Sequence, residues 1–531
     1  MKRLYIFIIL VALVAAGCNT EEKKQLEELQ QDLAELQNQQ LPGVPGQVTP
    51  EDCPQGDFAF AFDKTRYGVD AGSSVSVGYS LPEAATVEVI PNDGWSAAVN
   101  PINGSEGEIV ITAPDPAYPT EIVAKATTAD GRQTAVVLPV MVRDPYTDAT
   151  RTDVAAMGYY CLFNEVATDY HFKMMADCGM NMLTIESVDN WKEQLDLAHK
   201  YGMKGVLFVN GPAGDYYRNQ SDTKLTEIIE VSKNHPALAG YQIYDEPHMD
   251  AIPQIVFEKN RIEELDPDHP VYVNLHPSSA SVHSLGTEDF FEYVETFVTE
   301  CNLKFITFDQ YPVFDYGIDP TWPRSLEAIY QSSKKHDLQF WAFTLCCREH
   351  SREDPNVENI RLQCNVNLLY GAQVNQFFVY RNTSGTNYAP LLCTWENGQL
   401  KTEYTQAYYD CQTYCREMHN RGYVFSNCNV KKICNNKILI GWNQNLNQAD
   451  LQPYMKSLQT SDVALISFIE NKGNEYIAVV NYNWKAVNTI TAEFADMVYT
   501  IDHDGVFTEH AAGTTASFDI EGGDMLVFKV K

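Results

Sequence analysis

The sequence predicts an α/β protein in which a (β/α)8 (TIM) barrel is flanked by an N-terminal immunoglobulin-like β-sandwich and a C-terminal β-sandwich. Three observations support this fold class. The chain has 531 residues, which is too many for one ordinary domain. Through the middle of the chain, short apolar segments alternate with stretches of helical period. The flanking regions instead carry short alternating strands, punctuated by Gly, Pro, Asn and Asp.

Residues 1–18 have the layout of an export signal. The basic start MKR precedes the apolar run LYIFIILVALVAA, which is too short to span a bilayer comfortably, and small residues then lead to Cys18. The segment resembles a bacterial lipoprotein signal, although Ala15 stands where Leu is usual. That resemblance implies removal of the signal, lipidation of Cys18 and a membrane anchor. An ordinary secretory peptide with an incidental cysteine is the alternative.

Residues 19–57 are predicted to form a helical stalk followed by a Pro/Gly-rich linker. Glu21 and Glu22 follow Cys18 closely and resemble the surface-export signal of Bacteroides-type lipoproteins, which implies an outer-membrane lipoprotein exposed at the cell surface. Leucines with 3-4-3 spacing then mark barely two heptads, and Pro and Gly interrupt regular structure after them. These features predict a spacer that holds the rest of the chain away from a membrane.

Residues 58–145 are predicted to form the immunoglobulin-like sandwich. Segments such as ATVEVI, GEIVITA and TAVVLPVMV alternate apolar and polar residues, as half-buried strands do. No Cys-Trp-Cys core is present, so only the architecture is implied. We expect this unit to act as a spacer rather than as a carbohydrate-binding module, because no aromatic platform is evident.

Residues 150–420 are predicted to form the barrel. The expected strands are AAMGYYCLF, NMLTIES, KGVLFVN, AGYQIYDE, PVYVNLH, KFITFDQY, QFWAFTL and NQFFVYR, with helix-period segments between them. A doubly wound open sheet is the rival, but it would require a glycine-rich phosphate turn after an early strand, and the sequence has none there. Residues 421–531 return to short strands, which predicts the second sandwich.

Charge and cysteine usage limit the classes of function. The net charge of -33 argues against a nucleic-acid partner, because polyanions bind basic surfaces. It fits a neutral or cationic ligand better than an anionic one. No Cys or His spacing typical of a metal site appears, so no metal is predicted. The cysteines after Cys18 lie mostly in apolar or helical runs, where buried small side chains are the plain interpretation.

Polar and aromatic residues end nearly every predicted barrel strand. Reactive groups of such barrels lie at the carboxyl ends of the strands. Carboxylates, amides and aromatic rings suit a cleft that binds sugar hydroxyls and the apolar faces of sugar rings. In chain order the strand-end residues are Asn164, Glu186, Asn210, Asp245, Glu246, Asn274, His276, Asp309, Tyr311, Tyr380 and Asn382. Trp341, within the seventh strand, is a further candidate for a sugar platform.

The fourth predicted strand carries the most specific motif. Its ending, GYQIYDEPH, resembles the Asn-Glu-Pro strand ending of the clan of retaining β-glycosidases built on (β/α)8 barrels. The resemblance implies that Glu246 is the general acid/base, and that Asp245 stands where an Asn binds the sugar 2-hydroxyl. YDEPH, DPDHPVYVNLHP and FITFDQYPV also resemble glycosidase-like lipoproteins of gut Bacteroidetes, which carry the same two sandwiches.

This second resemblance covers most of the chain and implies a glycoside hydrolase. It would act on a polysaccharide or oligosaccharide at the cell surface, with other surface glycan-utilisation proteins as partners. The residues expected to bind the glycan are Glu186, Asn210, Asp245, Asn274, His276, Tyr311, Trp341 and Tyr380. No cofactor is implied, because carboxyl groups and fixed dipoles suffice for oxocarbenium chemistry.

The second catalytic carboxylate is less clearly marked. In the clan the nucleophile is a Glu at the end of the seventh strand, and FWAFTLCC offers none. Glycoside hydrolysis needs two carboxyls across the scissile bond, so Asp309, which ends the sixth strand, and Glu349, on the loop after the seventh, are the candidates. Asp309 is favoured.

Two alternatives stay open. A barrel without the seventh-strand Glu could be a non-catalytic surface glycan-binding lipoprotein, since fold does not fix function. The sequence Asp245-Glu246-Pro247 could also simply cap the helix that follows it, because Asp favours an N-cap and Pro a first turn.

Overall fold

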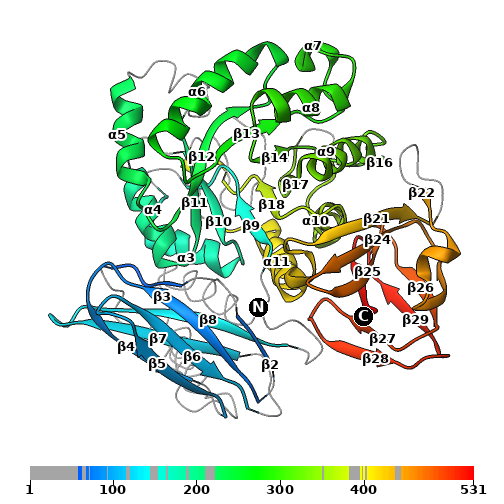
Figure 1. Ribbon diagram of the computed structural model, residues 1–531, viewed down its shortest axis with the longest axis horizontal. Helices are drawn as coiled ribbons and strands as arrows, with labels where there is room; N and C mark the ends of the chain where they lie inside the picture. The colour runs from blue at the N-terminus through cyan, green and yellow to red at the C-terminus, as the bar shows by residue number, and fades with distance from the viewer. Residues whose placement is uncertain are drawn as a thin grey trace, which may run out of the picture.

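The computed structural model describes three successive units, two sandwiches and a barrel (Figure 1). The described residues are 58–62, 67–70, 72–91, 94–114, 120–143, 153–162, 166–186, 190–209, 222–349, 352–381, 395–396, 399–400, 403–436 and 444–531. The predicted signal with Cys18 and the predicted stalk lie outside them, and so do Asn164, Asn210 and Asn382. In the described part, no helix has the length and apolar character needed to cross a membrane.

Eight parallel strands close into a barrel at the centre of the molecule. In order they are β9 (Ala155–Gly158), β10 (Met182–Ile185), β11 (Lys204–Phe208), β12 (Leu238–Asp245), β13 (Val271–Leu275), β14 (Phe305–Phe308), β17 (Gln339–Leu345) and β18 (Val374–Phe378). Each strand lies within an apolar segment that the sequence predicts, and β18 pairs with β9 to complete the ring. The predicted barrel is therefore confirmed.

A helix follows each barrel strand and lies outside the ring (Figure 1), because parallel neighbours need a crossover connection. These helices are α3 (Asp169–Asp177), α4 (Trp191–Lys200), α5 (Asp222–Ser232), α6 (Ile252–Leu265), α8 (Phe290–Glu300), α9 (Trp322–His336), α10 (Val357–Leu369) and α11 (Gln406–Phe425). In α9, Trp322, Leu326 and Ile329 share one face and are buried. The short helices η2 (Met249–Ala251) and α7 (Val282–Leu285) lie in loops.

The N-terminal unit consists of two four-stranded sheets, the sandwich that the sequence predicts. One sheet contains β1 (Ala61–Phe62), β3 (Ser74–Ser80), β6 (Glu106–Thr112) and β5 (Ser96–Pro101); the other contains β2 (Tyr67–Asp70), β8 (Gln133–Arg143), β7 (Thr120–Thr128) and β4 (Ala85–Ile90). Alternate residues of facing strands, such as Val77, Ile109 and Ala124, are fully buried between them.

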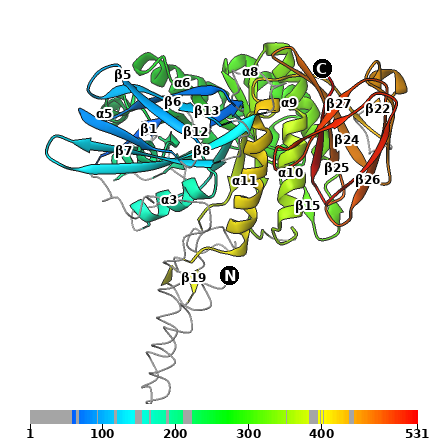
Figure 2. The ribbon, with the colours of Figure 1, turned by 90° about the horizontal axis from the view of Figure 1, so that it is seen from below.

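The C-terminal unit pairs a seven-stranded sheet with a three-stranded one. The larger sheet contains β22 (Gln444–Asn445), β21 (Asn429–Asn435), β24 (Ala464–Asn471), β25 (Asn474–Asn481), β30 (Met525–Lys529), β27 (Val498–Ile501) and β28 (Phe507–His510). The smaller contains β23 (Met455–Thr460), β26 (Asn488–Phe494) and β29 (Thr515–Ile520), and η3 (Gln448–Leu451) precedes it. The two sandwiches lie on different sides of the barrel (Figure 2), the C-terminal one against α10 and α11.

A buried ion pair joins α10 to α11 beside the C-terminal sandwich. Arg361 Nε and Nη2 donate to the two carboxylate oxygens of Glu417 at 2.9 and 2.6 Å, and only 2% of the Glu417 side chain is exposed. This bidentate geometry offsets the desolvation of both charges. The pair therefore fixes the position of the two helices that carry the barrel onto the second sandwich.

Breaking this pair should destabilise the fold far more than breaking a surface pair. Glu417→Gln leaves the Arg361 guanidinium buried without the carboxylate that it pairs with, so urea unfolding should report a loss of about 3 kcal/mol. The matched control is Glu493→Gln, which removes the exposed contact with Lys456 and should change stability little. Equal effects of the two substitutions would contradict a structural role for the Arg361–Glu417 pair.

Candidate active site

Five of the residues that the sequence analysis singles out meet at one end of the barrel: Asp245, Glu246, Asn274, His276 and Asp309. They follow or end β12, β13 and β14, three neighbouring strands. Asp245 pairs in register with Asn274, and the Glu246 N–H donates to the Asn274 carbonyl at 2.9 Å. Parallel pairing thus brings the carboxyl ends of these strands, and their side chains, to one edge.

Asn274 holds two of the carboxyls. Its Nδ2 donates to Asp245 Oδ1 at 3.0 Å and to Asp309 Oδ1 at 3.1 Å, while its Oδ1 accepts from Thr307 Oγ1 at 3.2 Å. Both amide hydrogens and the carbonyl are therefore used, which fixes the orientation of the amide. One buried side chain, 2% exposed, sets the positions of two acids.

A hydrogen-bonded chain inside the barrel supports Asn274 from below. Gln376 Nε2 donates to Thr307 Oγ1 at 2.9 Å, and the Tyr272 hydroxyl donates to Gln376 Oε1 at 2.5 Å. Thr307, Gln376 and Tyr272 are almost completely buried. Buried polar groups are costly unless satisfied, and a satisfied chain is rigid. The sequence analysis missed these residues; the signal for them was the polar Thr307 and Gln376 within otherwise apolar strands.

Glu246 adopts an unusual backbone conformation. Its φ is +46°, in the left-handed region that non-glycine residues seldom occupy. The carboxylate is 43% exposed, and Oε1 lies 3.2 Å from His276 Nδ1. Backbone strain of this kind persists only where the surrounding structure imposes it, and it concentrates at functional positions.

The Asp245-Glu246-Pro247 sequence does not act as a helix cap. The side chain of His248 caps η2 by accepting from the Asp250 N–H at 3.0 Å, and α6 begins after Ala251 with no side-chain cap. The capping alternative for these two carboxylates is therefore wrong.

The grouping of the acids raises the pKa values of Asp309 and Asp245. Burial raises the pKa of Asp309 well above its usual range, and the negative charges of Glu246 and Asp245 raise it further. Asp245 is partly exposed to solvent. Loss of solvation for its charged form nevertheless raises its pKa to about 6, and the negative charge of Glu246 contributes to this shift. The Asn274 N–H opposes both shifts, because it stabilises each carboxylate.

Glu186, at the end of β10, is a further shielded acid. It is 4% exposed, and burial raises its pKa to about 8, against the opposing effects of the Thr184 hydroxyl and Arg381. Thr184 Oγ1 donates to Oε1 at 3.1 Å, whereas Oε2 has no hydrogen-bond partner among the described residues. Since the charge of Asp245 also raises its pKa, Glu186 lies near the same group of acids.

Tyr311 follows β14 and Glu349 follows β17, so both lie at the same end of the barrel as the grouped acids. The ring of Tyr311 stacks on Phe378 with centroids 5.3 Å apart. Glu349 Oε2 accepts from Arg352 Nη1 at 3.0 Å. Asp309 shares Asn274 with Asp245 and its pKa responds to both neighbouring carboxylates, so Asp309 belongs to the hydrogen-bonded group of acids.

The structure does not bring Trp341 and Tyr380 to the mouth. Trp341 is the third residue of β17, so it lies towards the amino end of the barrel interior, where its ring stacks on Phe305 at 4.2 Å. Tyr380 is fully buried, and its hydroxyl donates to that of Tyr404 at 3.4 Å. Both are packing residues, because neither presents a ring face to a ligand.

Among the described residues, no group of three or more His, Cys, Asp or Glu side chains could hold a metal ion.

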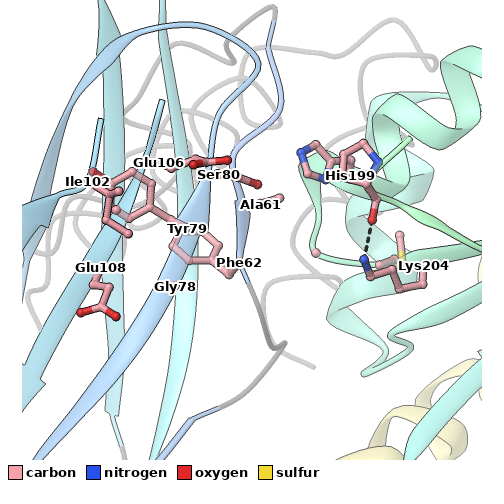
Figure 3. A pocket seen from close by; sticks show the side chains of 14 residues that line it. Ala61, Phe62, Gly78, Tyr79, Ser80, Ile102, Glu106, Glu108, His199 and Lys204 are labelled. Carbon is pink, nitrogen blue, oxygen red and sulfur yellow. Dashed lines mark hydrogen bonds between the residues drawn. The ribbon is translucent and has the colours of Figure 1, made fainter. Parts of the chain in front are cut away.

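A cavity of about 380 Å³ lies elsewhere, between the N-terminal sandwich and the barrel (Figure 3). Tyr79, Glu106 and Glu108 line it from the sandwich, and His199 and Lys204 line it from the barrel. Lys204 begins β11 and donates to the Pro236 carbonyl (Figure 3). The cavity is therefore at the amino end of the barrel strands, away from the grouped acids.

The chain was compared with known proteins. No family model and no curated protein matches it. Similar solved structures are glycoside hydrolases. A putative α-galactosidase/melibiase from Bacteroides fragilis is 12% identical with a TM-score of 0.41, covering 90% of this chain and 98% of that one. A β-glucuronidase from Ruminococcus gnavus is 12% identical with a TM-score of 0.35, covering 68% and 67%.

A GH2 β-galacturonidase from Eisenbergiella tayi is 14% identical with a TM-score of 0.35, covering 68% of this chain and 71% of that one. These likenesses are distant, and the description of the barrel rests on the strand pairing of this chain.

Replacing Asp309 with a neutral Asn should make the protein more stable than the wild type at pH 7 but not at pH 4. Its folded-state pKa lies above its unfolded value, so its ionisation costs native-state stability progressively above about pH 4. Asp309→Asn removes that cost. Its melting temperature should match that of the wild type at pH 4 and exceed it by about 2 °C at pH 7. The exposed Asp268 supplies the control, Asp268→Asn, which should show no such divergence. A destabilised Asp309→Asn at pH 7 would contradict the raised pKa.

Proposed function

We propose that this protein hydrolyses a glycosidic bond of an oligosaccharide or polysaccharide. The observation that carries the proposal is the grouping of a half-buried Asp309, held by Asn274 and with a pKa raised well above its usual range, near the more exposed carboxylate of Glu246. Two carboxyl groups in unlike environments are what acid-catalysed cleavage of an acetal requires. The distant fold likenesses to glycosidases do not bear on this chemistry.

The different environments of Asp309 and Glu246 suggest different catalytic roles for the two residues. Asp309, whose pKa is raised well above its usual range, would hold a proton and donate it to the leaving glycosidic oxygen as the C–O bond breaks. Glu246 would stabilise the positive charge that develops on the anomeric carbon, either by bonding to that carbon or by activating a water. If Glu246 bonds to the anomeric carbon, the Asp309 carboxylate takes a proton from the water that then releases the sugar, which restores the acid. If Glu246 instead activates the attacking water, Glu246 takes that proton, and both groups return to their starting states by proton exchange with solvent. This is the reverse of the assignment that the clan resemblance implies, in which Glu246 is the acid/base.

Three further residues are suited to hold the sugar. Asp245 accepts hydrogen bonds from hydroxyls, and His276 lies beside Glu246 where it can orient that carboxylate. Glu186, whose pKa is raised to about 8, would donate in its protonated form from the oxygen that has no partner in the described part of the chain. A mouth with this many acids favours a neutral or cationic sugar over an anionic one, because like charges repel.

Hydrolysis is tested on aryl glycosides and polysaccharides with the purified chain. Glu246→Gln and Asp309→Asn should each lower kcat by about 10³-fold, because each removes a group that acts on the reacting atoms. Asp268→Asn should retain wild-type activity. Glycan binding without turnover, unchanged by Glu246→Gln, would instead support the non-catalytic surface glycan-binding protein that the missing seventh-strand Glu leaves open.

We also propose that the chain is anchored at the cell surface as an outer-membrane lipoprotein. The support is the sequence of residues 1–22: a basic start, a short apolar run, small residues before Cys18, and the acidic pair after it. A glycan at the cell surface, and other surface glycan-utilisation proteins, would then be within reach. Labelling of growing cells with a fatty acid should mark the wild type and not Cys18→Ala. Equal labelling of the two would contradict the anchor.

A further inference from the structure

An exposed aromatic hairpin lies beyond the grouped acids. Between β14 and α9, the chain forms β15 (Val313–Phe314) and β16 (Gly317–Ile318), which pair antiparallel. Tyr316, in the turn, is 79% exposed, and its ring stacks on that of Phe314 with centroids 5.1 Å apart and an interplanar angle of 20°. A single exposed ring is ordinary on a protein surface, so the notable feature is the packing of Tyr316 onto Phe314 and the groups behind it.

Arg352 fastens this hairpin to the loop after β17. Its Nε donates to the Tyr311 carbonyl at 3.0 Å and its Nη1 to Glu349 at 3.0 Å. Its guanidinium lies over the rings of both Tyr311 and Phe314, at 5.5 and 5.0 Å from their centroids. The backbones of Arg352 and Phe314 also form a bridge. The hairpin is therefore held in place before any ligand arrives.

The hairpin is continuous with the site. Phe378 and Tyr311 stack at 5.3 Å, Arg352 covers Tyr311 and Phe314, and Phe314 stacks on Tyr316. Tyr311 is two residues beyond Asp309, whose charge acts on it. A row of planar groups, here called the aromatic row, thus runs from beside the proposed acid outward to Tyr316.

We propose that Tyr316, the exposed end of the aromatic row, is the platform of a binding subsite for a sugar of the same glycan, remote from the bond that is cleaved. The inference rests on the proposed function and specifies its substrate class: an oligosaccharide or polysaccharide rather than a small glycoside. Flat rings bind the C–H faces of neutral sugars through apolar contact, and a rigid platform loses little conformational freedom on binding. The acid-rich mouth next to the row agrees with a neutral glycan.

The test compares substrates of increasing length with the full chain purified in detergent. Aryl monoglycosides and gluco-, galacto-, manno- and xylo-oligosaccharides are assayed with wild type and with Tyr316→Ala. For the oligosaccharide series that the wild type cleaves, kcat/KM should rise with length. Tyr316→Ala should lower kcat/KM about fivefold on the longer members, mainly through KM, and leave aryl monoglycosides unchanged.

Two variants serve as matched controls. Tyr316→Phe keeps the ring and should behave as the wild type. Phe257→Ala removes a ring that is 64% exposed on α6, away from the mouth, and should have no effect. Equal activity of wild type and Tyr316→Ala on every length would overturn the subsite and leave the hydrolase proposal intact.

If no substrate is cleaved, the proposed hydrolase fails, and calorimetric binding of the same oligosaccharides decides the subsite. Binding weakened about fivefold in Tyr316→Ala supports it, whereas equal binding, or no binding to either chain, overturns it.

Discussion

The site depends on one amide that holds two acids. Asn274 donates one hydrogen to Asp245 and the other to Asp309, so both carboxyls are kept near Glu246 although like charges repel. The repulsion is relieved by protonation, and burial selects Asp309 as the acid whose pKa rises most clearly. A carboxylic acid whose pKa is raised well above its usual range is thus a direct consequence of the packing at the ends of three strands.

The barrel interior contributes to this arrangement. A wholly apolar interior would leave the amide of Asn274 free to rotate, but Thr307 and Gln376 extend the hydrogen bonding down to Tyr272. The cost of burying these groups is offset only while each one is paired. The left-handed backbone at Glu246 is a second such cost at the same place. The buried polar chain and the left-handed backbone at Glu246 therefore both hold the acids in one geometry, at a cost to the stability of the fold.

Much of this could be predicted from the sequence, and the reasons for the failures are physical. Strand and helix periods located the barrel, and parallel pairing made Asp245, Asn274 and Asp309 neighbours once their strands were known. Strand and helix periods carry no distance along the barrel axis and no side-chain direction, so Trp341 was predicted as a sugar platform and Tyr380 as a glycan-binding residue although both pack internally. Tyr316 was missed because its hairpin lies in a loop, where neither period applies.

The most direct test of this account is the protonation state of Asp309 at neutral pH. Infrared difference spectra of the wild type against Asp309→Asn report it, since a protonated carboxyl has a carbonyl stretching band that a carboxylate lacks. The account predicts that the wild type shows this band at pH 7 and that Asp309→Asn loses it. A spectrum at pH 7 in which Asp309 contributes only carboxylate bands would contradict it.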